Sequence, residues 1–431
     1  MQLTKIGKIS SALAVASQLL VSPNAQADEN SSDAVWDYDT AILYYGEDSG
    51  RVMASEGMFG ATRTNGDGQV FSSKLTVDAL TGASPTGAVA QNEAQTFTRP
   101  SGNGSYVVAP GDTPLDDTFH DTRVQLNLGW SSPINRVWDW STGLHLSKEY
   151  DYLSLGGNLG FTRSLNQNNT ALTMGIGGYF DTLEPEGGIP VGGSEMVYRN
   201  DYSSDAEFNA AFDNTRQDSS ETKTTTELNF GVSQVINRWL ITSLNYNYSN
   251  VSGYLTDPFK LVSVVDETGT TQQNLYENRP DSRTKHVLFW QTKANISGQV
   301  LDVSYRYMLD DWEIDSHTID VRYNYRFSNN HYLEPHIRFY TQSAADFYSP
   351  YIMSSAALPE YMSADYRLGE MNTYTIGFKY GLPINDDELA FRLEYYVQQP
   401  KNAGFDEPGQ LAQHDLYPEI SAIIAQVNYS F

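Results

Sequence analysis

Charged residues recur at every second position along several segments in the second half of the chain. In the stretch HTIDVRYNYRF, residues 317–327, Asp320, Arg322 and Arg326 share one parity, and the other parity is apolar or aromatic. Successive side chains of a β-strand point to opposite faces, so this spacing predicts a strand with one charged face. The same parity predicts a wet surface lined by twelve residues: Asp302, Arg306, Asp320, Arg322, Arg326, Glu334, His336, Arg338, Lys379, Glu388, Arg392 and Glu394.

The set contains both acids and bases, and neighbouring strands are expected to place opposite charges at cross-strand distance. In one interpretation these residues form a constriction whose transverse field orders water and selects solutes. In the other they form a salt-bridged lining that stiffens the wall, since paired charges at a wet surface are common and individually weak. The second interpretation is the simpler one for any single residue, and the sequence leaves both open.

Two further groups of residues have types suited to hydrolytic chemistry. One predicted hairpin gathers an acidic cluster with a histidine: Asp310, Asp311, Glu313, Asp315 and His317. An acid–histidine pair can activate water, and His286, close to Ser282, could act as a lipase base. Neither group shows the orienting partner of a catalytic triad. We therefore expect no enzymatic activity, no catalytic residue, no metal and no cofactor, with an outer-membrane hydrolase as a remote alternative.

The alternation that positions these residues recurs along the whole chain. Apolar residues at every second position predict sixteen strands, at residues 35–45, 51–63, 69–80, 121–132, 137–149, 152–165, 170–182, 223–236, 239–252, 284–297, 299–309, 315–328, 331–343, 370–382, 387–398 and 420–431. Most of these segments match the ~9–11 residues with which a tilted strand crosses a bilayer.

The connections between these segments are sorted by length. Tight turns rich in Gly, Pro and Asn alternate with a second series that contains five long loops, at roughly 81–120, 183–222, 253–283, 344–369 and 399–419. With both chain ends on one side, an even number of strands puts the tight turns on the periplasmic face and the long loops outside. Outer-membrane barrels have this asymmetry, whereas a soluble sandwich has no reason to sort its loops.

Composition favours the same fold. The chain has 29 Tyr, 18 Phe and 7 Trp among 431 residues, yet its mean hydropathy is −0.45, and a β-barrel hides hydrophobicity by alternation. The apolar face of residues 317–327 is expected to meet lipid, because each Arg at the bilayer midplane would cost about 2–4 kcal/mol. We predict an all-β fold: a closed, antiparallel, up-and-down transmembrane β-barrel of about sixteen strands over residues 28–431.

Both ends of the chain carry export signals. A basic N-terminal stretch precedes apolar residues 9–21, and the sequence AQA at residues 25–27 fits the cleavage rule, so residues 1–27 are predicted to be a cleaved signal peptide. Phe431 ends an alternating segment similar to the C-terminal signal that outer-membrane assembly machinery reads. The expected location is the outer membrane of a Gram-negative bacterium, with lipid, lipopolysaccharide and that machinery as partners.

Charge and cysteine content exclude other classes of partner. The formal net charge is −26, and it becomes −28 once Lys5 and Lys8 leave with the signal peptide, which argues against nucleic acid. There is no cysteine, and therefore no disulfide or thiolate metal site. Residues 183–222 carry nine acids against two arginines. This loop could funnel cations or bind divalent ions near lipopolysaccharide, although such a loop is more often simply solvated.

Four stretches resemble a family of uncharacterised exported bacterial barrels that carries only a domain-of-unknown-function label. They are VDALTGAS (residues 77–84), GYLTDPFK (253–260), RPDSRTKH (279–286) and, in support, DDWEIDSHT (310–318). The resemblance implies an outer-membrane barrel and supplies no activity. On the predicted segmentation, all four stretches fall at outer strand ends or at the bases of loops.

The predicted function is a channel for small hydrophilic solutes with a charged lumen. The alternative belongs to a different class: a non-conducting sleeve or scaffold that surrounds a lipoprotein or redox partner. A barrel of sixteen strands is wide enough to leave an aqueous channel unless loops occupy it. The sequence alone does not separate these two functions.

Overall fold

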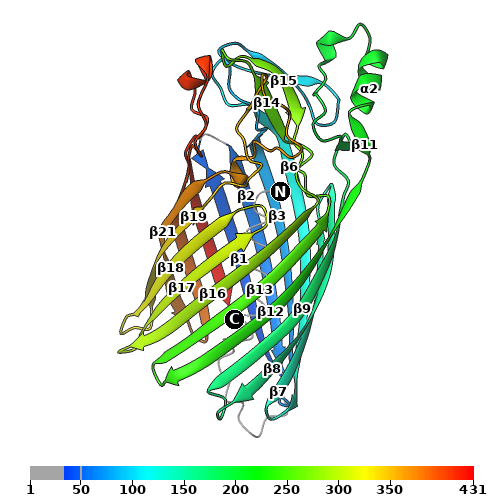
Figure 1. Ribbon diagram of the computed structural model, residues 1–431. Helices are drawn as coiled ribbons and strands as arrows, with labels where there is room; N and C mark the ends of the chain where they lie inside the picture. The colour runs from blue at the N-terminus through cyan, green and yellow to red at the C-terminus, as the bar shows by residue number, and fades with distance from the viewer. Residues whose placement is uncertain (1–33, 49–50) are drawn as a thin grey trace.

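The computed structural model describes residues 34–48 and 51–431. The chain forms a closed ring of sixteen antiparallel strands, and long loops build a cap over one end (Figure 1). Each barrel strand pairs with the barrel strands before and after it, and the ring closes where β1 (Val35–Glu47) pairs with β23 (Ile420–Ser430). The predicted signal peptide, residues 1–27, lies outside the described residues.

The sixteen predicted segments are the sixteen strands of the ring, which confirms the predicted fold class. Between β1 and β23 the ring contains β2 (Val52–Thr64), β3 (Val70–Pro85), β6 (Leu115–Asn135), β7 (Trp138–Lys148), β8 (Tyr152–Leu165), β9 (Thr170–Leu183), β12 (Glu221–Asn237), β13 (Leu240–Gly253), β16 (Ser282–Ile296), β17 (Gln299–Asp310), β18 (Asp315–Arg326), β19 (Tyr332–Gln342), β21 (Met371–Ile384) and β22 (Asp387–Pro400). The largest boundary difference is at β3 and β6, which keep pairing beyond their predicted ends through a register shift between Gly82 and Ser84.

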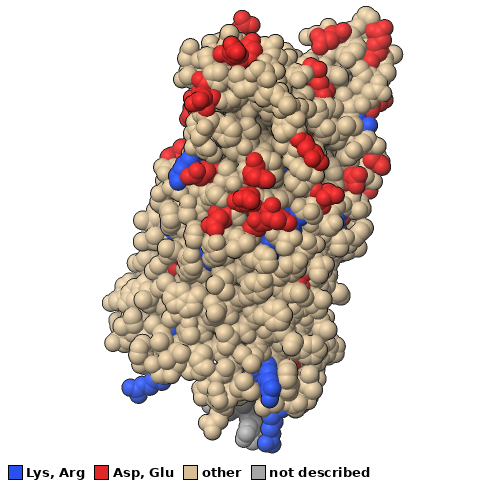
Figure 2. Space-filling view, in the orientation of Figure 1, with Lys and Arg blue, Asp and Glu red and all other residues tan. Residues whose placement is uncertain are grey.

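The outer face of the barrel is apolar. Ile337 of β19 and Ile376 of β21 are cross-strand partners, and 58% and 61% of their surfaces are exposed. Figure 2 shows a broad band of barrel wall with few charged groups, between an acidic end at the cap and scattered Lys and Arg at the other end. A belt of this kind suits hydrocarbon, because a paired strand has no unsatisfied backbone group to expose. In the described residues, no helix is long and apolar enough to span a membrane.

Turns and loops separate to opposite ends of the barrel, as predicted. The shortest turns include Ser297-Gly298, where both residues have positive φ, 56° and 90°, a conformation that suits a two-residue hairpin turn. The five long connections are residues 86–114, 184–220, 254–281, 343–370 and 401–419. They leave the ring at the same end and together form the cap (Figure 1).

The cap has secondary structure that the sequence analysis did not predict. Where the structure describes it, the cap contains three small sheets, a helix and several short 3-10 turns: β4 (Gln95–Thr98) with β5 (Ser105–Val108), β10 (Ile189–Pro190) with β11 (Arg216–Asp218), β14 (Leu261–Val265) with β15 (Thr271–Tyr276) and β20 (Ile352–Met353), α2 (Asp205–Asp213), η2 (Arg199–Asp201), η3 (Tyr366–Leu368) and η4 (Gly409–Gln413). All five residues of β14 are buried, so this strand forms the centre of the cap.

The cap also packs into the mouth of the barrel. Val287 of β16 and Met308 of β17 have the lumen-facing parity, and they form one buried cluster with Trp312, Phe347 and Leu368. Phe347 and Leu368 belong to the loop at residues 343–370. This loop therefore enters the outer mouth, where its apolar side chains pack against the barrel wall.

We expect Ile337→Arg to lower the free energy of unfolding in lipid vesicles by about 2–4 kcal/mol, because this side chain faces outward near the middle of β19. Urea titration of the protein refolded into vesicles measures the change. Asn245→Arg is the matched control: Asn245 lies on the lumen-facing parity of β13, and the shift should stay below about 1 kcal/mol. An equal loss of unfolding free energy in the two variants would contradict the assignment of Ile337 to the lipid-facing side and Asn245 to the lumen.

Candidate functional site

Three lumen-facing side chains near mid-height form the centre of a polar network. The Nε2 atom of His336 on β19 lies 2.9 Å from Asp320 Oδ2 on β18. Its Nδ1 atom lies 2.8 Å from Glu394 Oε1 on β22. Both ring nitrogens can donate only when the imidazole carries two protons. His336 can therefore donate to both carboxylates at once only when its imidazole is positively charged.

Glu394 reaches His336 across an intervening strand. Gly377 of β21 is the register partner of both residues. A Cβ atom on Gly377 would lie 2.6 Å from Glu394 Cγ and 2.4 Å from the carbonyl oxygen of Leu393, closer than packed atoms approach without displacement. The glycine thus leaves open the path along which the carboxylate and the imidazole meet.

Arginines surround this centre. Arg338 Nε donates to Asp320 Oδ2 at 2.7 Å, and Arg322 Nη2 lies 3.4 Å from the same oxygen. Arg392 Nε lies 3.8 Å from Glu394 Oε1. Six of the twelve predicted lumen residues are therefore brought together, and cations outnumber carboxylates among them: Asp320, Arg322, His336, Arg338, Arg392 and Glu394.

Three predicted residues form smaller contacts on the side of the network nearer the short turns. Glu388 Oε1 accepts a hydrogen bond from the Tyr332 hydroxyl at 2.5 Å and lies 3.6 Å from Lys379 Nζ. Asn324 donates its amide to Glu334 Oε2 at 3.1 Å. These contacts agree with the interpretation of a stiffened wall, since each acid has a partner on a different strand.

The last three predicted residues have other contacts, although Asp302 is the register partner of Arg322. Asp302 is 3.4 Å from Lys293 Nζ and accepts from the Gln291 amide at 2.9 Å. In the described part of the chain, Arg306 Nε and Nη2 have no hydrogen-bond partner. Arg326 lies at the short-turn end, where its backbone amide donates to Gln299 Oε1 at 2.5 Å.

The sequence analysis missed a second charged group on the lumen side. Arg123 of β6 donates from Nε to Asp78 Oδ2 of β3 at 2.7 Å and lies 3.6 Å from Glu56 Oε2 of β2. The signal was present, because Asp78 and Arg123 alternate with apolar residues in their strands. The twelve predicted residues all lie in the C-terminal half, where lumen-facing charges are more numerous.

The wall halfway around the ring from this network is lined by small neutral groups. β7, β8 and β9 present glycines and asparagines on their lumen-facing parity, among them Gly143, Asn158 and Gly177, which are neighbours in register. The ring order places β7 and β8 eight strands from β19 and β21. At the height of these three residues the charged network therefore faces a neutral stretch of wall, a geometry that generates a field across the bore. Nearer the cap, Asp181 of β9 lies 3.8 Å from Lys223 of β12.

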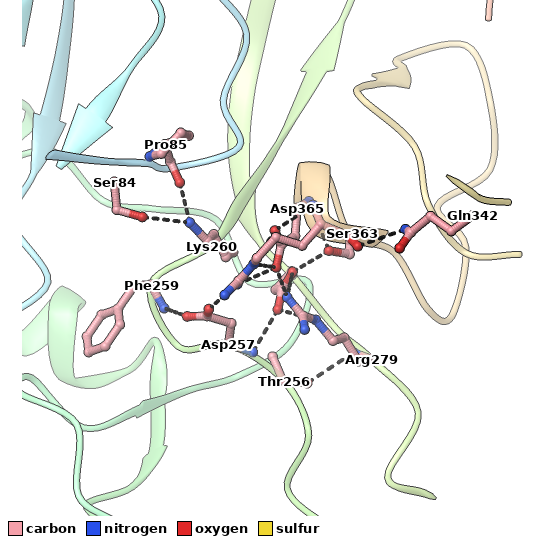
Figure 3. Close-up of polar contacts among 12 residues, drawn as sticks. Ser84, Pro85, Thr256, Asp257, Phe259, Lys260, Arg279, Gln342, Ser363 and Asp365 are labelled. Carbon is pink, nitrogen blue, oxygen red and sulfur yellow. Dashed lines mark hydrogen bonds and ion pairs between the residues drawn. The ribbon is translucent and has the colours of Figure 1, made fainter. Parts of the chain in front are cut away.

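The cap contains a third ionic group, which is largely buried (Figure 3). It joins three acids and three bases from the loops at 254–281 and 343–370: Asp257, Lys260, Glu277, Arg279, Asp365 and Arg367. The side chains of Glu277, Arg279 and Asp365 are at most 1% exposed. Buried charges are tolerated only when they are paired and hydrogen-bonded.

Direct contacts hold this group together. Arg279 Nη2 donates to Asp365 Oδ2 at 2.8 Å and to Glu277 Oε2 at 3.0 Å. Arg367 donates from Nε to Asp365 Oδ1 at 2.7 Å and from Nη2 to Asp257 Oδ2 at 2.8 Å. Figure 3 shows Lys260 pointing instead to the end of β3, where its ammonium donates to the Ser84 hydroxyl at 3.2 Å and to a backbone carbonyl. The group thus ties the loop at 343–370 to its neighbours.

The balance of burial and pairing decides the ionisation of these residues. Burial alone would raise the pKa of Asp257, but the nearby charges of Arg367, Lys260 and Arg279 outweigh it and lower the pKa to about 2. The same opposition, with Arg367 and Arg279 dominant, lowers the pKa of Asp365 well below its usual value. Burial raises the pKa of Glu277 and lowers that of Lys260. Asp257 and Asp365 are therefore ionised at any physiological pH.

The residues considered for hydrolysis have structural partners. Asp310 accepts from Arg283 Nε at 2.7 Å, and its other oxygen accepts two backbone N–H groups of the following turn. His317 lies between a tyrosine hydroxyl at 2.7 Å and Asp315 Oδ1 at 3.1 Å, and His286 contacts another tyrosine hydroxyl at 2.8 Å. His317 and His286 have the lipid-facing parity of their strands, as the exposed Ile319 and Leu288 indicate.

The acidic loop at 183–222 is ordered around α2. Ser204 caps the helix by accepting a hydrogen bond from the Glu207 backbone amide at 3.3 Å. Two side chains of the helix, Phe208 and Phe212, are buried. The helix stands at the edge of the cap in Figure 1. Over the residues that the structure describes, no group of three or more His, Asp or Glu side chains is arranged to hold a metal ion.

The four stretches that carry the family resemblance meet at these polar contacts. Asp257, Lys260, Arg279 and Ser84 come from three of them, and the fourth supplies Asp310, which pairs with Arg283. A family model described as "Protein of unknown function (DUF3570)" matches residues 10–431. The chain belongs to this family. Membership in the DUF3570 family extends over nearly the whole chain and attaches no activity to it. No curated protein sequence matches the chain.

Solved structures with similar folds are distant in sequence. They include CdiB from Acinetobacter baumannii (TM-score 0.44, 9% identity, 92% of this chain and 60% of that chain) and the ferric enterobactin receptor of Pseudomonas aeruginosa (TM-score 0.42, 9% identity, 87% and 56%). A third is a bacterial polysaccharide outer membrane secretin, with a TM-score of 0.41 and 9% identity. The match covers 92% of this chain and 98% of that chain. The chain spans 60% and 56% of the first two structures. At scores this low, no ligand or partner is transferred to the DUF3570 chain.

Gly377→Ala should lower the free energy of unfolding by about 1–3 kcal/mol, because the new methyl group has to displace Glu394 and adjoining backbone. Thermal unfolding in detergent micelles, followed by mobility on unheated gels, measures the change. Gly175→Ala is the control, since a Cβ atom there meets its nearest neighbour at 3.4 Å and should be almost neutral. If Gly377→Ala unfolded at the wild-type temperature while Gly175→Ala unfolded at a lower one, the result would contradict this account.

Acid should open the cap only at very low pH. Asp257 and Asp365 have pKa values below the usual 3.8, so the stability they contribute is present above about pH 4 and is lost as the pH falls towards about 2. Glu277 contributes to the pH dependence of stability with the opposite sign. Its pKa is raised, so its protonation at low pH does not lower the free energy of unfolding. Pepsin, which is active across this range, should leave the cap intact at pH 4 and cut it at pH 2. Cleavage that is already complete at pH 4 would contradict the assignment.

Proposed function

We propose that the chain is an outer-membrane channel for small hydrophilic solutes, with a charged constriction at mid-height and a folded cap over its outer mouth. One observation supports this most directly. Apolar side chains cover the outside of a closed barrel, while His336, Asp320 and Glu394 join with arginines on one side of the lumen. A wet, polar lumen with fixed charge selects solutes by charge and size.

The cap gives this channel a restricted entrance. The loop at 343–370 packs into the mouth against Val287 and Met308, and Asp365 and Arg367 anchor it to the rest of the cap. A displacement of this single loop would widen the entrance without changing the barrel. We propose that permeation depends on its motion, as is common for loops that gate access.

Location and assembly belong to the same proposal. The signal sequence at residues 1–27 is expected to direct export and to be cleaved. Phe431 pairs with the backbone of Tyr38 at 2.8 and 2.9 Å, and its ring is exposed at the seam of the barrel. This exposed aromatic ring is available to assembly machinery, and in this proposal the acidic cap faces lipopolysaccharide and its divalent cations.

The sleeve remains the second candidate, and the cap is the observation that favours it. A barrel closed at one end and bordered by short turns at the other is accessible from the periplasmic side, where a lipoprotein or redox partner could enter. Such a protein would conduct poorly and would co-purify with its partner.

Planar-bilayer recording of the purified protein tests these functions. The wild type should give small or brief conductance steps, and Asp365→Asn should give larger or longer ones. Removal of one partner from a buried ion pair costs about 3–5 kcal/mol, enough to free the loop. Asp205→Asn breaks the exposed Arg199–Asp205 pair of the cap, 2.6 Å, and should behave like the wild type. If the wild type and both variants gave no conductance steps, and a second protein chain co-purified with them, the result would favour the sleeve and contradict the channel.

A further inference from the structure

One row of side chains on the outer face of the barrel is interrupted by a cation. At the short-turn end, Trp36 of β1, Arg63 of β2, Phe71 of β3 and Trp130 of β6 are successive cross-strand partners. The three aromatic side chains are 41–46% exposed, and Arg63 is exposed as well. The row therefore places one guanidinium among rings that face lipid.

The guanidinium of Arg63 has an aromatic partner and retains its hydrogen-bonding edges. Its Cζ atom lies 5.8 Å from the centre of the Trp36 ring. A stacked guanidinium still presents N–H groups in its plane, and these match a phosphate or carboxylate in bidentate geometry. Among the described residues, no carboxylate forms an ion pair with Arg63, and within that part of the chain the guanidinium is available to a bound anion.

A hollow of about 230 Å³ lies against this row. It is lined by Arg63, Phe71 and Trp130 together with two amide side chains of the adjacent turn, Asn65 and Gln69. Asn65 Oδ1 is buried and has no hydrogen-bond partner in the described residues. The hollow thus combines a cation, two amide side chains and two aromatic walls.

These groups together describe an amphiphilic anion. The aromatic walls can pack against an acyl chain, Arg63 can donate hydrogen bonds to a phosphate, and the amide side chains of Asn65 and Gln69 supply further polar groups beside it. We propose that this hollow is a binding site for one glycerophospholipid of the leaflet at the short-turn end. Only the identity of that leaflet depends on the proposed function; the site itself does not require conduction.

The chain supplies a matched comparison. Arg163 of β8 lies over Trp138 of β7 at 5.5 Å, in the same cross-strand geometry and at the same end of the barrel. Neither residue lines the hollow beside Arg63. An effect of interfacial charge alone would involve both arginines equally, whereas a built site involves Arg63 alone.

Native mass spectrometry of the protein in detergent, titrated with phosphatidylglycerol, tests the proposal. The wild type should retain one lipid, and Arg63→Gln should bind it about tenfold more weakly, which corresponds to about 1.4 kcal/mol for a charge-assisted contact. Arg163→Gln should match the wild type within about twofold, a difference too small to indicate a lost ion pair. Mobility on unheated gels shows that each variant is folded, and Phe71→Leu, which removes a ring without removing charge, provides a second test of the same site.

Three outcomes would overturn the proposal. Unchanged binding by Arg63→Gln would remove the role of the guanidinium, and equal loss in Arg163→Gln would reduce the effect to general interfacial charge. Displacement of the lipid by millimolar inorganic phosphate would mean that the site recognises a free anion. Retention of the lipid in the presence of phosphate, with weaker binding by both Arg63→Gln and Phe71→Leu, supports the phospholipid.

Discussion

Hydrocarbon offers no hydrogen bond to a peptide group, and the main features of this structure depend on that constraint. A strand in the bilayer has to pair along both edges, so the sheet closes where β1 meets β23. Closure separates a face in lipid from a face around a wet lumen, and strand alternation distributes the side chains between them. Arg322 and Arg338 lie inside for this reason, because the outer face at their height is in hydrocarbon.

The large apolar side chains of the barrel face outward, and dry packing is concentrated in the cap. There β14 is buried throughout, and Phe97, Met362 and Leu411 are at most 1% exposed. The buried ionic group beside this core contributes differently. Charge pairs of this kind add little net stability, but they penalise any arrangement that separates them. Apolar contacts thus stabilise the cap, while Arg279 and Asp365 fix how its loops meet.

The alternating pattern was sufficient to predict all sixteen barrel strands, because lipid and water make opposite demands on the two faces of each. It also placed His336 and Glu394 on the lumen wall, but their contact across Gly377 depends on a register that one strand alone does not reveal. β14 was missed because a strand buried on both faces does not alternate. Asp365 and Arg367 carried no pattern, since loops distant in sequence bring them together.

The composition of the cap core has a consequence for the order in which the molecule can fold. Val89, Val265, Tyr351 and Leu411 pack in one cluster, although more than three hundred residues separate the first from the last. Contacts between such distant positions carry a large loop-closure cost unless the strands between them are already in register. The cap core is therefore expected to pack late, and a chain arrested during insertion would leave these loops open to proteolysis.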